Sequence, residues 1–255
     1  MKDSIKEHIK VFGCFIGLFI LRFYISRFVK TFIQHHSAID YVLAVFTMVL
    51  FTAIVFVLYI RWVGWDTFRL KGISWKIWFW TFLLCMSQCF FIWTIYGYPV
   101  WIENYYMSEG ITDFNYVAYI ISGFNGIFCF SVINAILFRG LLQKQSSKIL
   151  APWLSISIIT ILLIVLNFKT IAFIPQVFLS GIFVGIIYHK TDKLILCILY
   201  SSFFSFIWNT TRTSFDRSFS WVFFIISIAF AAYAIRGFIK YKPQNNELSD
   251  NQQIN

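Results

Sequence analysis

Hydrolytic chemistry would need acidic residues, histidines or cysteines that meet at one point, and this chain has few that could. A zinc hydrolase needs His, Glu, Asp or Cys ligands and a carboxylate that activates water. No acidic residue occurs between Asp113 and Asp192, a stretch that contains three hydrophobic segments. The four histidines lie away from the middle of every hydrophobic segment: His8, His35, His36 and His189. The sequence therefore predicts no metal, no cofactor and no conventional catalytic residues.

The stretch SVINAILFRGLLQK (131–144) contains the polar residues whose place in the chain is most informative. It holds Asn134, Arg139 and Gly140 in an otherwise apolar run, with no carboxylate nearby. Arg139 ends a hydrophobic segment, so it can be an ordinary anchor that extends its charge to the membrane surface. It can also be the remaining part of a site whose other residues have changed. A single residue does not separate these two interpretations.

The composition is that of a membrane protein: 59% of residues are hydrophobic and 13% charged, against about a quarter charged in soluble domains. Seven runs lack charged residues and histidine, and each approaches the ~20 residues that cross a ~30 Å hydrocarbon core: 41–60, 77–102, 114–138, 149–168, 170–188, 194–211 and 218–235. An eighth segment, 11–30, contains Arg22 and Arg27, which can both extend toward a membrane surface. We expect an all-α membrane protein with about eight transmembrane helices.

The charge distribution predicts the orientation of these spans. With a cytoplasmic amino terminus and alternating spans, 15 of the 21 Lys and Arg residues fall on the cytoplasmic side. The loop 103–113 has three acidic residues and no basic one, and falls outside. This asymmetry follows the positive-inside rule and places both termini in the cytoplasm. The excess of basic residues behind the net charge of +10 is then explained by the orientation of the protein in the membrane. The sequence therefore predicts the lipid bilayer as a partner and no nucleic acid.

One polytopic membrane domain is expected at 11–241, between a cytoplasmic amino-terminal arm (1–10) and a disordered cytoplasmic tail (242–255). The Trp-rich connection 61–76 is either a membrane-surface helix or an interfacial loop. The pair Gly181 and Gly185 predicts close helix packing, and Pro152 and Pro175 stand where a first helical turn tolerates proline. Cys85 and Cys89 share a helical face, where packing is the expected role and a metal site the alternative.

The polar residues inside the hydrophobic segments are almost all uncharged. Such side chains face the interior of a helix bundle, where they form interhelical hydrogen bonds or contribute to a binding site. Both roles stay open for each of them: Ser87, Gln88, Asn125, Ser131, Asn134, Asn167, Gln176, Ser180, Ser201, Ser202, Ser205 and Asn209.

The stretch INAILFRGLLQ resembles the first motif of the CPBP family, the CAAX proteases and bacteriocin-processing proteins also called Abi. That motif reads roughly E-E-x-x-x-R-G at the cytoplasmic end of a transmembrane helix. The later stretch FLSGIFVGIIYHKTDKLILCILYSSFFSF (178–206) is similar to the next helices of the family, and the resemblance covers about residues 114–209. It implies an all-helical bundle with a cavity open to one face, in which active members use a metal-dependent or glutamate-dependent peptidase site.

Carried over residue by residue, the resemblance puts neutral side chains where the family has its glutamates. The two glutamates correspond to Asn134 and Ala135, whereas the arginine and glycine are kept as Arg139 and Gly140. Positions 135 and 139 lie one helical turn apart, so a glutamate at 135 would support the arginine and alanine does not. We therefore expect the Arg139 guanidinium to face cytoplasmic water or to hydrogen-bond uncharged groups and carbonyls.

The histidine motifs of the family are replaced in the same way. The F-x-x-x-H pair corresponds to Leu163 and Asn167, and the H-x-x-x-N pair to Ser201 and Ser205. No catalytic residue is predicted. The motif positions that we expect to line the cavity are Asn134, Ala135, Arg139, Gly140, Asn167, Ser201 and Ser205.

Three functions from different classes follow. The first is a non-catalytic CPBP-like protein of the bacterial cell membrane that binds a membrane protein or peptide in its cavity, for bacteriocin self-immunity or for regulation of a cell-envelope enzyme. The second is an active CAAX-type peptidase with a divergent site, which would require His189, or His35 and His36, to reach the cavity. The third is a transporter, against which the lack of charged residues in the spans argues.

Overall fold

The computed structural model describes residues 2–34, 38–70, 73–96, 99–101, 129–166, 174–213 and 220–241. Nearly all of these residues are helical. The elements are α1 (Lys2–Gln34), α2 (Ala38–Val63), the 3₁₀ turn η1 (Asp66–Phe68), α3 (Trp75–Tyr96), β1 (Pro99–Trp101), α6 (Phe130–Asn134), η3 (Ala135–Gln143), α7 (Lys144–Ser146), α8 (Pro152–Leu166), α9 (Ile174–Thr191), α10 (Leu194–Thr210), β2 (Thr211–Thr213) and α11 (Ser220–Lys240). The predicted all-helical class is confirmed, apart from one short strand pair.

Within the described part of the chain, three helical stretches are long and apolar enough to cross a membrane: Val45–Val63, Trp75–Tyr96 and Trp221–Lys240. Helices α8 and α10 contain shorter apolar stretches. These stretches fall in five of the eight hydrophobic segments. The helices also expose many large apolar side chains, Trp221 and Ile225 among them, as lipid-facing surfaces do.

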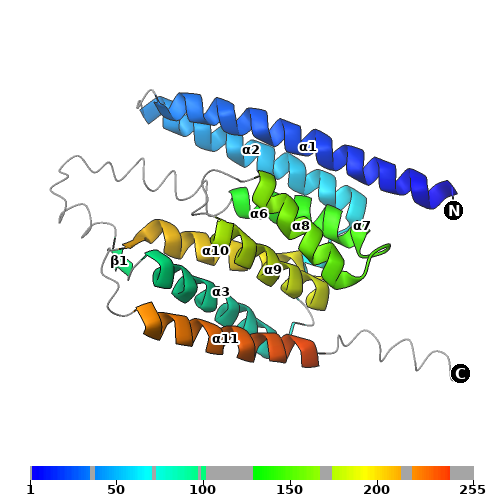
Figure 1. The fold of residues 1–255 in the computed structure, drawn as a ribbon. Coiled ribbons are helices and arrows are strands. Elements are labelled where there is room, and N and C mark those ends of the chain that lie inside the picture. The colour runs from blue at the N-terminus through cyan, green and yellow to red at the C-terminus, as the bar shows by residue number, and fades with distance from the viewer. Residues whose placement is uncertain are drawn as a thin grey trace, which may run out of the picture.

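The helices lie roughly along one direction in three groups (Figure 1). Helices α1 and α2 pack together on one side of the bundle, and α3 and α11 pack together on the other. Between them lie the continuous rod α6–η3–α7 and the helices α8, α9 and α10. The central group is therefore covered by a helix pair on each of two sides.

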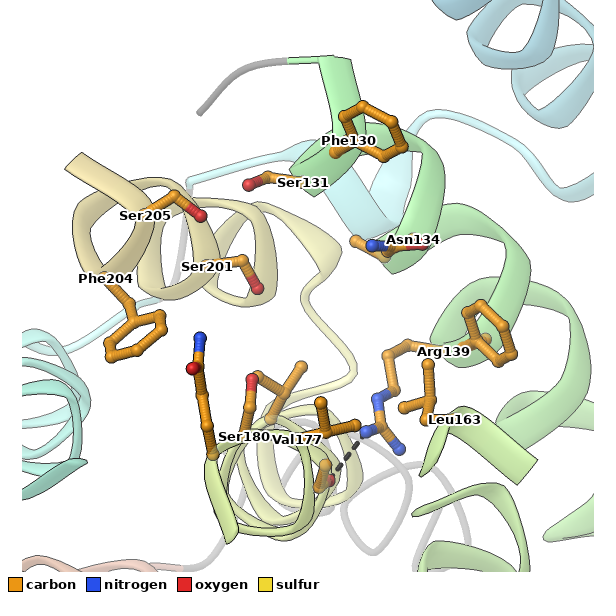
Figure 2. A pocket seen from close by; sticks show the side chains of 15 residues that line it. Phe130, Ser131, Asn134, Arg139, Leu163, Val177, Ser180, Ser201, Phe204 and Ser205 are labelled. Carbon is orange, nitrogen blue, oxygen red and sulfur yellow. Dashed lines mark hydrogen bonds between the residues drawn. The ribbon is translucent and has the colours of Figure 1, made fainter. Parts of the chain in front are cut away.

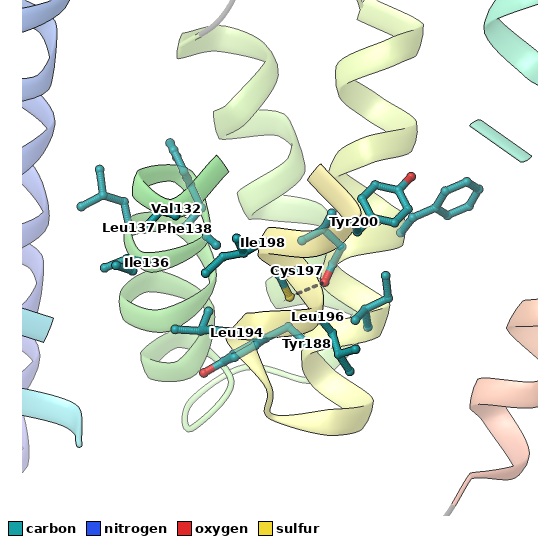
Figure 3. Close-up of a cluster of buried hydrophobic side chains, with 14 of the residues drawn as sticks. Val132, Ile136, Leu137, Phe138, Tyr188, Leu194, Leu196, Cys197, Ile198 and Tyr200 are labelled. Atoms are coloured by element: carbon teal, nitrogen blue, oxygen red, sulfur yellow. Dashed lines mark hydrogen bonds between the residues drawn. The ribbon is translucent and has the colours of Figure 1, made fainter. Parts of the chain in front are cut away.

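Figure 3 shows apolar side chains of η3, α9 and α10 meeting in the core of the central group. Ile136, Leu137 and Ile187 are fully buried there, as are Leu196 and Cys197. The Cys197 thiol lies 3.8 Å from the carbonyl oxygen of Val184. This packing fixes η3 against α9 and α10.

One end of the bundle gathers described basic residues. The Lys193 ammonium donates to the carbonyl of Asp66 at 3.0 Å, which joins the α9–α10 connection to the α2–α3 connection. Trp62 at the end of α2 and Lys144 at the start of α7 line one small cavity. Helix α1 begins and α11 ends at this side (Figure 1). We call it the basic end, defined by Arg61, Arg69, Lys144, Lys148, Lys190 and Lys193.

The opposite end is closed by the strand pair. Strands β1 and β2 run antiparallel, with Pro99 opposite Thr213 and Trp101 opposite Thr211. The hydrophobic runs 77–102 and 194–211 reach into these strands, so the expectation that they are helical throughout is wrong at their ends. Proline lacks a backbone N–H and glycine disfavours helix, which accounts for the stop of α3 before Gly97 and Pro99.

The glycine pair of α9 packs as predicted. A Cβ atom on Gly181 would lie 2.7 Å from a methyl carbon of Thr160, and one on Gly185 would lie 2.7 Å from a methyl carbon of Ile156. Both neighbours belong to α8, so the two glycines allow α8 and α9 to approach closely. Pro152 begins α8, in the first turn where its missing N–H costs nothing.

The expectation for Arg22 needs correction. Arg22 does not extend to a membrane surface: it is 8% exposed, and its guanidinium carbon lies 5.3 Å from the ring centre of Phe130. A cation over an aromatic face is stabilised by the ring quadrupole, which makes burial possible.

The described residues of the connection 61–76 belong to the end of α2, the 3₁₀ turn η1, the short links beside it and the start of α3, which favours the interfacial loop of the two alternatives. Helix α1 starts at Lys2, and the cytoplasmic position of the arm 1–10 stays a prediction. The tail 242–255 lies outside the described residues.

Candidate functional site

A polar cavity of about 230 Å³ lies among α6, η3, α8, α9 and α10 (Figure 2). Its walls combine phenyl rings, hydroxyl groups, amides and one guanidinium. The residues that line it are Phe130, Ser131, Asn134, Ala135, Phe138, Arg139, Leu163, Gln176, Val177, Ser180, Gly181, Val184, Ser201, Phe204 and Ser205. We call this cavity the Arg139 pocket.

Most motif positions meet in the Arg139 pocket. Asn134, Ala135, Arg139, Ser201 and Ser205 all line it, although more than 60 residues of chain separate Arg139 from Ser201. The rod α6–η3 carries the first motif and α10 carries the serine pair, and Figure 2 shows Asn134 and Arg139 on one side of the pocket and Ser201 and Ser205 on the other.

Of the remaining motif positions, one lies away from the pocket, one lines it and one is not described. Gly140 packs against α2, where a Cβ atom would come within 2.6 Å of the Tyr59 ring. Asn167 lies outside the described residues, as does Asn125. Leu163, which corresponds to the phenylalanine four residues before Asn167, does line the pocket. Gly140 is thus a packing residue of the first motif.

Arg139 is 2% exposed and is bound by uncharged groups. Its Nη1 donates to Oε1 of Gln143 at 2.8 Å, and its Nη2 donates to the carbonyl of Gly181 at 2.6 Å. Gln143 Nε2 donates in turn to the carbonyl of Gly185 at 2.9 Å. The expected hydrogen bonds to uncharged groups and carbonyls are confirmed, and the interpretation of Arg139 as a surface anchor is wrong.

These bonds depend on matched spacing in two helices. Arg139 and Gln143 are four residues apart on η3, and Gly181 and Gly185 are four residues apart on α9. Arg139 therefore faces the carbonyl of Gly181, and Gln143 faces the carbonyl of Gly185. A Cβ atom on Gly185 would lie 3.2 Å from Arg139 Nη1, so glycine also makes room for the guanidinium. The Gly-x-x-x-Gly pattern therefore serves both helix packing and the site.

The backbone around Arg139 is π-helical from Ala135 to Gln143. The N–H of Lys144 donates to the carbonyl of Arg139, five residues earlier, instead of four. Widened turns of this kind are rare in helices and occur frequently at functional sites. The helix also continues to Ser146, so Arg139 lies inside the rod and not at its end.

Two acceptors of the Arg139 pocket have no hydrogen-bond partner among the residues that the structure describes. They are Oδ1 of Asn134 and Oε1 of Gln176, both buried. Buried polar atoms are nearly always paired with protein or water, so two unpaired oxygens in one cavity indicate that a bound molecule or water supplies donors there. The pocket thus offers one acceptor on α6, one acceptor on α9 and one positive charge on η3.

The residues that line the pocket do not fit a catalytic metal ion. Zn²⁺ and similar ions need His, Cys, Asp or Glu ligands, and the lining contains amides, hydroxyls and a guanidinium whose positive charge repels a cation. No three His, Cys, Asp or Glu side chains come together anywhere in the described ranges. No hydrolytic step through a metal follows from this set.

His189, the one histidine of the last helices, lies away from the pocket. It stands in the last turn of α9 at the basic end, is largely exposed, and does not line the cavity. Burial and the neighbouring Lys190 lower the pKa of His189 below its ordinary value. Its imidazole is therefore neutral near pH 7, but it has no place at the Arg139 pocket. His35 and His36 lie outside the described residues.

Other buried polar residues form interhelical hydrogen bonds. Ser87 and Ser227 each donate to the other's carbonyl at 2.9 Å, which joins α3 to α11. Gln88 Nε2 donates to the carbonyl of Gln176 at 3.1 Å, and its Oε1 is bonded to the hydroxyl of Tyr200. Of the two roles left open for Ser87 and Gln88, interhelical hydrogen bonding is confirmed. Cys85 and Cys89 are buried in the same core.

Sequence reasoning missed Gln143, the direct partner of Arg139. Its signal was the spacing i,i+4 from Arg139, which places the two side chains on one helix face. Nothing else in the sequence indicates that Gln143 lies inside the protein, because it stands next to Lys144, where a polar side chain is expected to face water. Only the packing of η3 against α9 turns Gln143 inward, to 1% exposure.

Fold and site define an all-helical, membrane-type protein with a buried polar pocket built from its central helices. A family model described as Type II CAAX prenyl endopeptidase Rce1-like matches residues 116–207. The chain thus carries an Rce1-like domain of the CPBP family at these residues, which confirms the resemblance. All residues of the Arg139 pocket lie inside the matched range. No curated protein and no solved structure matches the chain.

Proposed function

We propose that this protein uses its Rce1-like domain to bind a peptide or a segment of a membrane protein without cleaving it. One observation carries the proposal: all but one of the motif positions that the structure describes line one pocket, and each of these is neutral except the buried Arg139. Such a pocket keeps the shape of a peptide site without its acid, base or metal ligands. The family name by itself does not fix the activity, because function depends on the residues of the site.

The chemistry of the pocket suits a polypeptide segment. The unpaired oxygens of Asn134 and Gln176 accept hydrogen bonds from backbone amides, and Arg139 attracts a carbonyl or carboxylate. Phe130 and Phe204 offer apolar contacts for side chains. A volume of about 230 Å³ admits only a short stretch of chain, below the size of ordinary small-molecule sites.

We further propose a setting in a bacterial cell membrane, with eight transmembrane helices and both termini in the cytoplasm. The clustering of basic residues at one end of the bundle supports this orientation, because positive charge favours the cytoplasmic side. A bound bacteriocin-like peptide would make the protein a self-immunity factor, and a bound enzyme segment would make it a regulator of the cell envelope.

Co-purification from mild detergent tests binding at the pocket. The parent protein and Ser201→Trp, whose indole would fill the pocket, are purified in parallel, with Ser157→Trp on the exposed face of α8 as the matched control. We expect a partner at constant ratio with the parent protein and Ser157→Trp, and at least about a tenfold loss with Ser201→Trp. Equal recovery by all three, or no partner under several conditions, would contradict the proposal.

An active peptidase is the second candidate, because the family model is that of an endopeptidase. It would need a base or ligand from residues outside the described ranges, such as His35 and His36, because His189 lies away from the pocket. Incubation of the purified protein with a prenylated CAAX peptide, with and without added Zn²⁺, tests it by mass spectrometry of the products. Under our proposal the peptide stays intact, and His189→Ala changes nothing. Zinc-dependent cleavage that Ser201→Trp abolishes would establish the peptidase instead.

A further inference from the structure

A second cavity of about 590 Å³ opens between α1 and α8, near the basic end and apart from the Arg139 pocket. Its walls are largely apolar, with Phe12 on α1, Leu142 on η3 and Ile158 and Leu162 on α8. Phe12 and Ile158 are themselves well exposed, so the cavity is a groove on the outer face of the bundle. We call it the α1–α8 groove. A groove that faces the hydrocarbon region accepts an acyl chain.

The groove adjoins a basic cavity at its outer end. This smaller cavity, of about 210 Å³, is lined by Lys144, Lys148 and Trp62. The two cavities share Val11 and Gln145, so they form one continuous surface that is apolar at one end and positively charged at the other. A lipid with a negatively charged headgroup matches this surface, because its headgroup fits the basic cavity and its acyl chain fits the apolar groove.

Gln145 provides a second, independent indication of a ligand. Its Nε2 is buried and has no hydrogen-bond acceptor in the described part of the chain. Since Gln145 lines both cavities, this unpaired donor stands where the apolar and basic parts meet. An ester or phosphate oxygen of a lipid at that junction would satisfy it.

The depth of the groove corresponds to one leaflet of a bilayer. Leu162 follows Pro152, the first residue of α8, by ten residues, or about 15 Å of helix at ~1.5 Å per residue. Half of a ~30 Å hydrocarbon core is about the same distance. An acyl chain whose headgroup lies at the level of Lys144 and Lys148 therefore reaches the bottom of the groove near the bilayer centre.

We propose that the α1–α8 groove binds one anionic glycerophospholipid from the leaflet at the basic end. Its phosphate lies between Lys144 and Lys148, the Gln145 amide donates to a headgroup oxygen, and one acyl chain fills the groove along Phe12 and Leu162. The site is separate from the Arg139 pocket and does not depend on the function proposed there. An uncharged or zwitterionic lipid occupies the groove less tightly, because the two ammonium groups gain no net attraction from it.

Native mass spectrometry of the purified full-length protein tests this site. The protein is titrated in detergent with phosphatidylglycerol or with phosphatidylcholine of the same acyl chains. We expect one phosphatidylglycerol to bind at least about tenfold more tightly than phosphatidylcholine. Lys144→Gln with Lys148→Gln should abolish this preference, whereas Lys190→Gln with Lys240→Gln, the same charge change at the same end, should keep it.

A pair of glycine substitutions tests the position of the acyl chain. Gly13 lines the groove and Gly17 does not, and a Cβ atom on either meets nothing within 4 Å. Gly13→Trp should reduce phosphatidylglycerol binding at least about tenfold, and Gly17→Trp should leave it unchanged. Equal affinity of the parent protein for the two lipids would overturn the proposal. So would a preference for phosphatidylglycerol that survives the double lysine substitution, or tight phosphatidylglycerol binding that survives Gly13→Trp.

Discussion

Gln143→Leu should lower the free energy of unfolding by about 3 kcal/mol. The substitution removes the acceptor of Arg139 Nη1 and the donor to the Gly185 carbonyl. A hydrogen bond to a charged group contributes about 2 kcal/mol and one between neutral groups about 1 kcal/mol. Arg139 is 2% exposed, so no water replaces the lost partner. Equilibrium unfolding in mixed dodecyl maltoside and SDS micelles, followed by tryptophan fluorescence, measures the loss.

A second substitution separates the charge effect from packing. Adding Arg139→Met to Gln143→Leu removes the buried cation and keeps most of its volume, so the double variant should return to within about 1 kcal/mol of the parent protein. Gln145→Leu, two residues further, is the matched control and should cost little, because within the described ranges its amide nitrogen has no partner to lose. A double variant less stable than Gln143→Leu alone would show that Arg139 does not depend on Gln143.

The double variant also isolates the role of Arg139 in binding. It keeps the fold but removes the one charged side chain that lines the described pocket. Under the proposed function, recovery of the co-purified partner should fall at least about tenfold while the unfolding curve stays close to that of the parent. Full recovery of the partner would mean that the guanidinium serves the fold alone.

Gly185→Leu should destabilise the protein by about 3 kcal/mol, toward the upper end of the usual cost of overpacking. The first side-chain carbon would already lie 2.7 Å from Ile156 Cγ2 and 3.2 Å from Arg139 Nη1. The larger side chain must therefore separate α8 from α9 and displace Gln143 from the Gly185 carbonyl. The same unfolding measurement reports the effect.

Gly17→Leu is the matched control for this substitution. Gly17 is an exposed residue of α1 with open space around its Cα, and leucine is the better helix former by roughly 0.5–1 kcal/mol. We expect unchanged or slightly increased stability. If Gly185→Leu and Gly17→Leu had equal effects, the close α8–α9 contact would not exist in the folded protein.

The sequence alone predicted the features that depend on composition and on residue spacing. The lengths of the hydrophobic runs gave the helices, since a run of uncharged residues near 20 has few other stable forms in a membrane. The Gly181 and Gly185 spacing gave the close helix contact, and the motif spacing gave positions such as Ser201 and Ser205 that meet Arg139 across one pocket.

What the sequence missed depends on contacts between distant segments. Arg22 was expected to extend to a membrane surface, and for Arg139 a position facing water stayed open beside hydrogen bonds to uncharged groups, because arginine in a hydrophobic run usually reaches for water. The structure buries both: Phe130 covers Arg22, and the carbonyl of Gly181, 42 residues away, accepts from Arg139. These two partners lie far along the chain, so the local pattern, which includes Phe19 and Gln143, does not reveal them.

The sequence by itself determined that this is a helical membrane-type chain with an Rce1-like domain at 116–207, and that no acidic residue occurs between Asp113 and Asp192. These properties follow from residue types and spacings, which a sequence states directly. Only the tertiary structure decided that Arg139 and Gln143 form a buried, uncharged bonding pair with α9, and that the motif positions share one cavity. The reason is physical: whether a polar side chain faces water, lipid or another helix is set by the packing of helices that lie far apart in the chain.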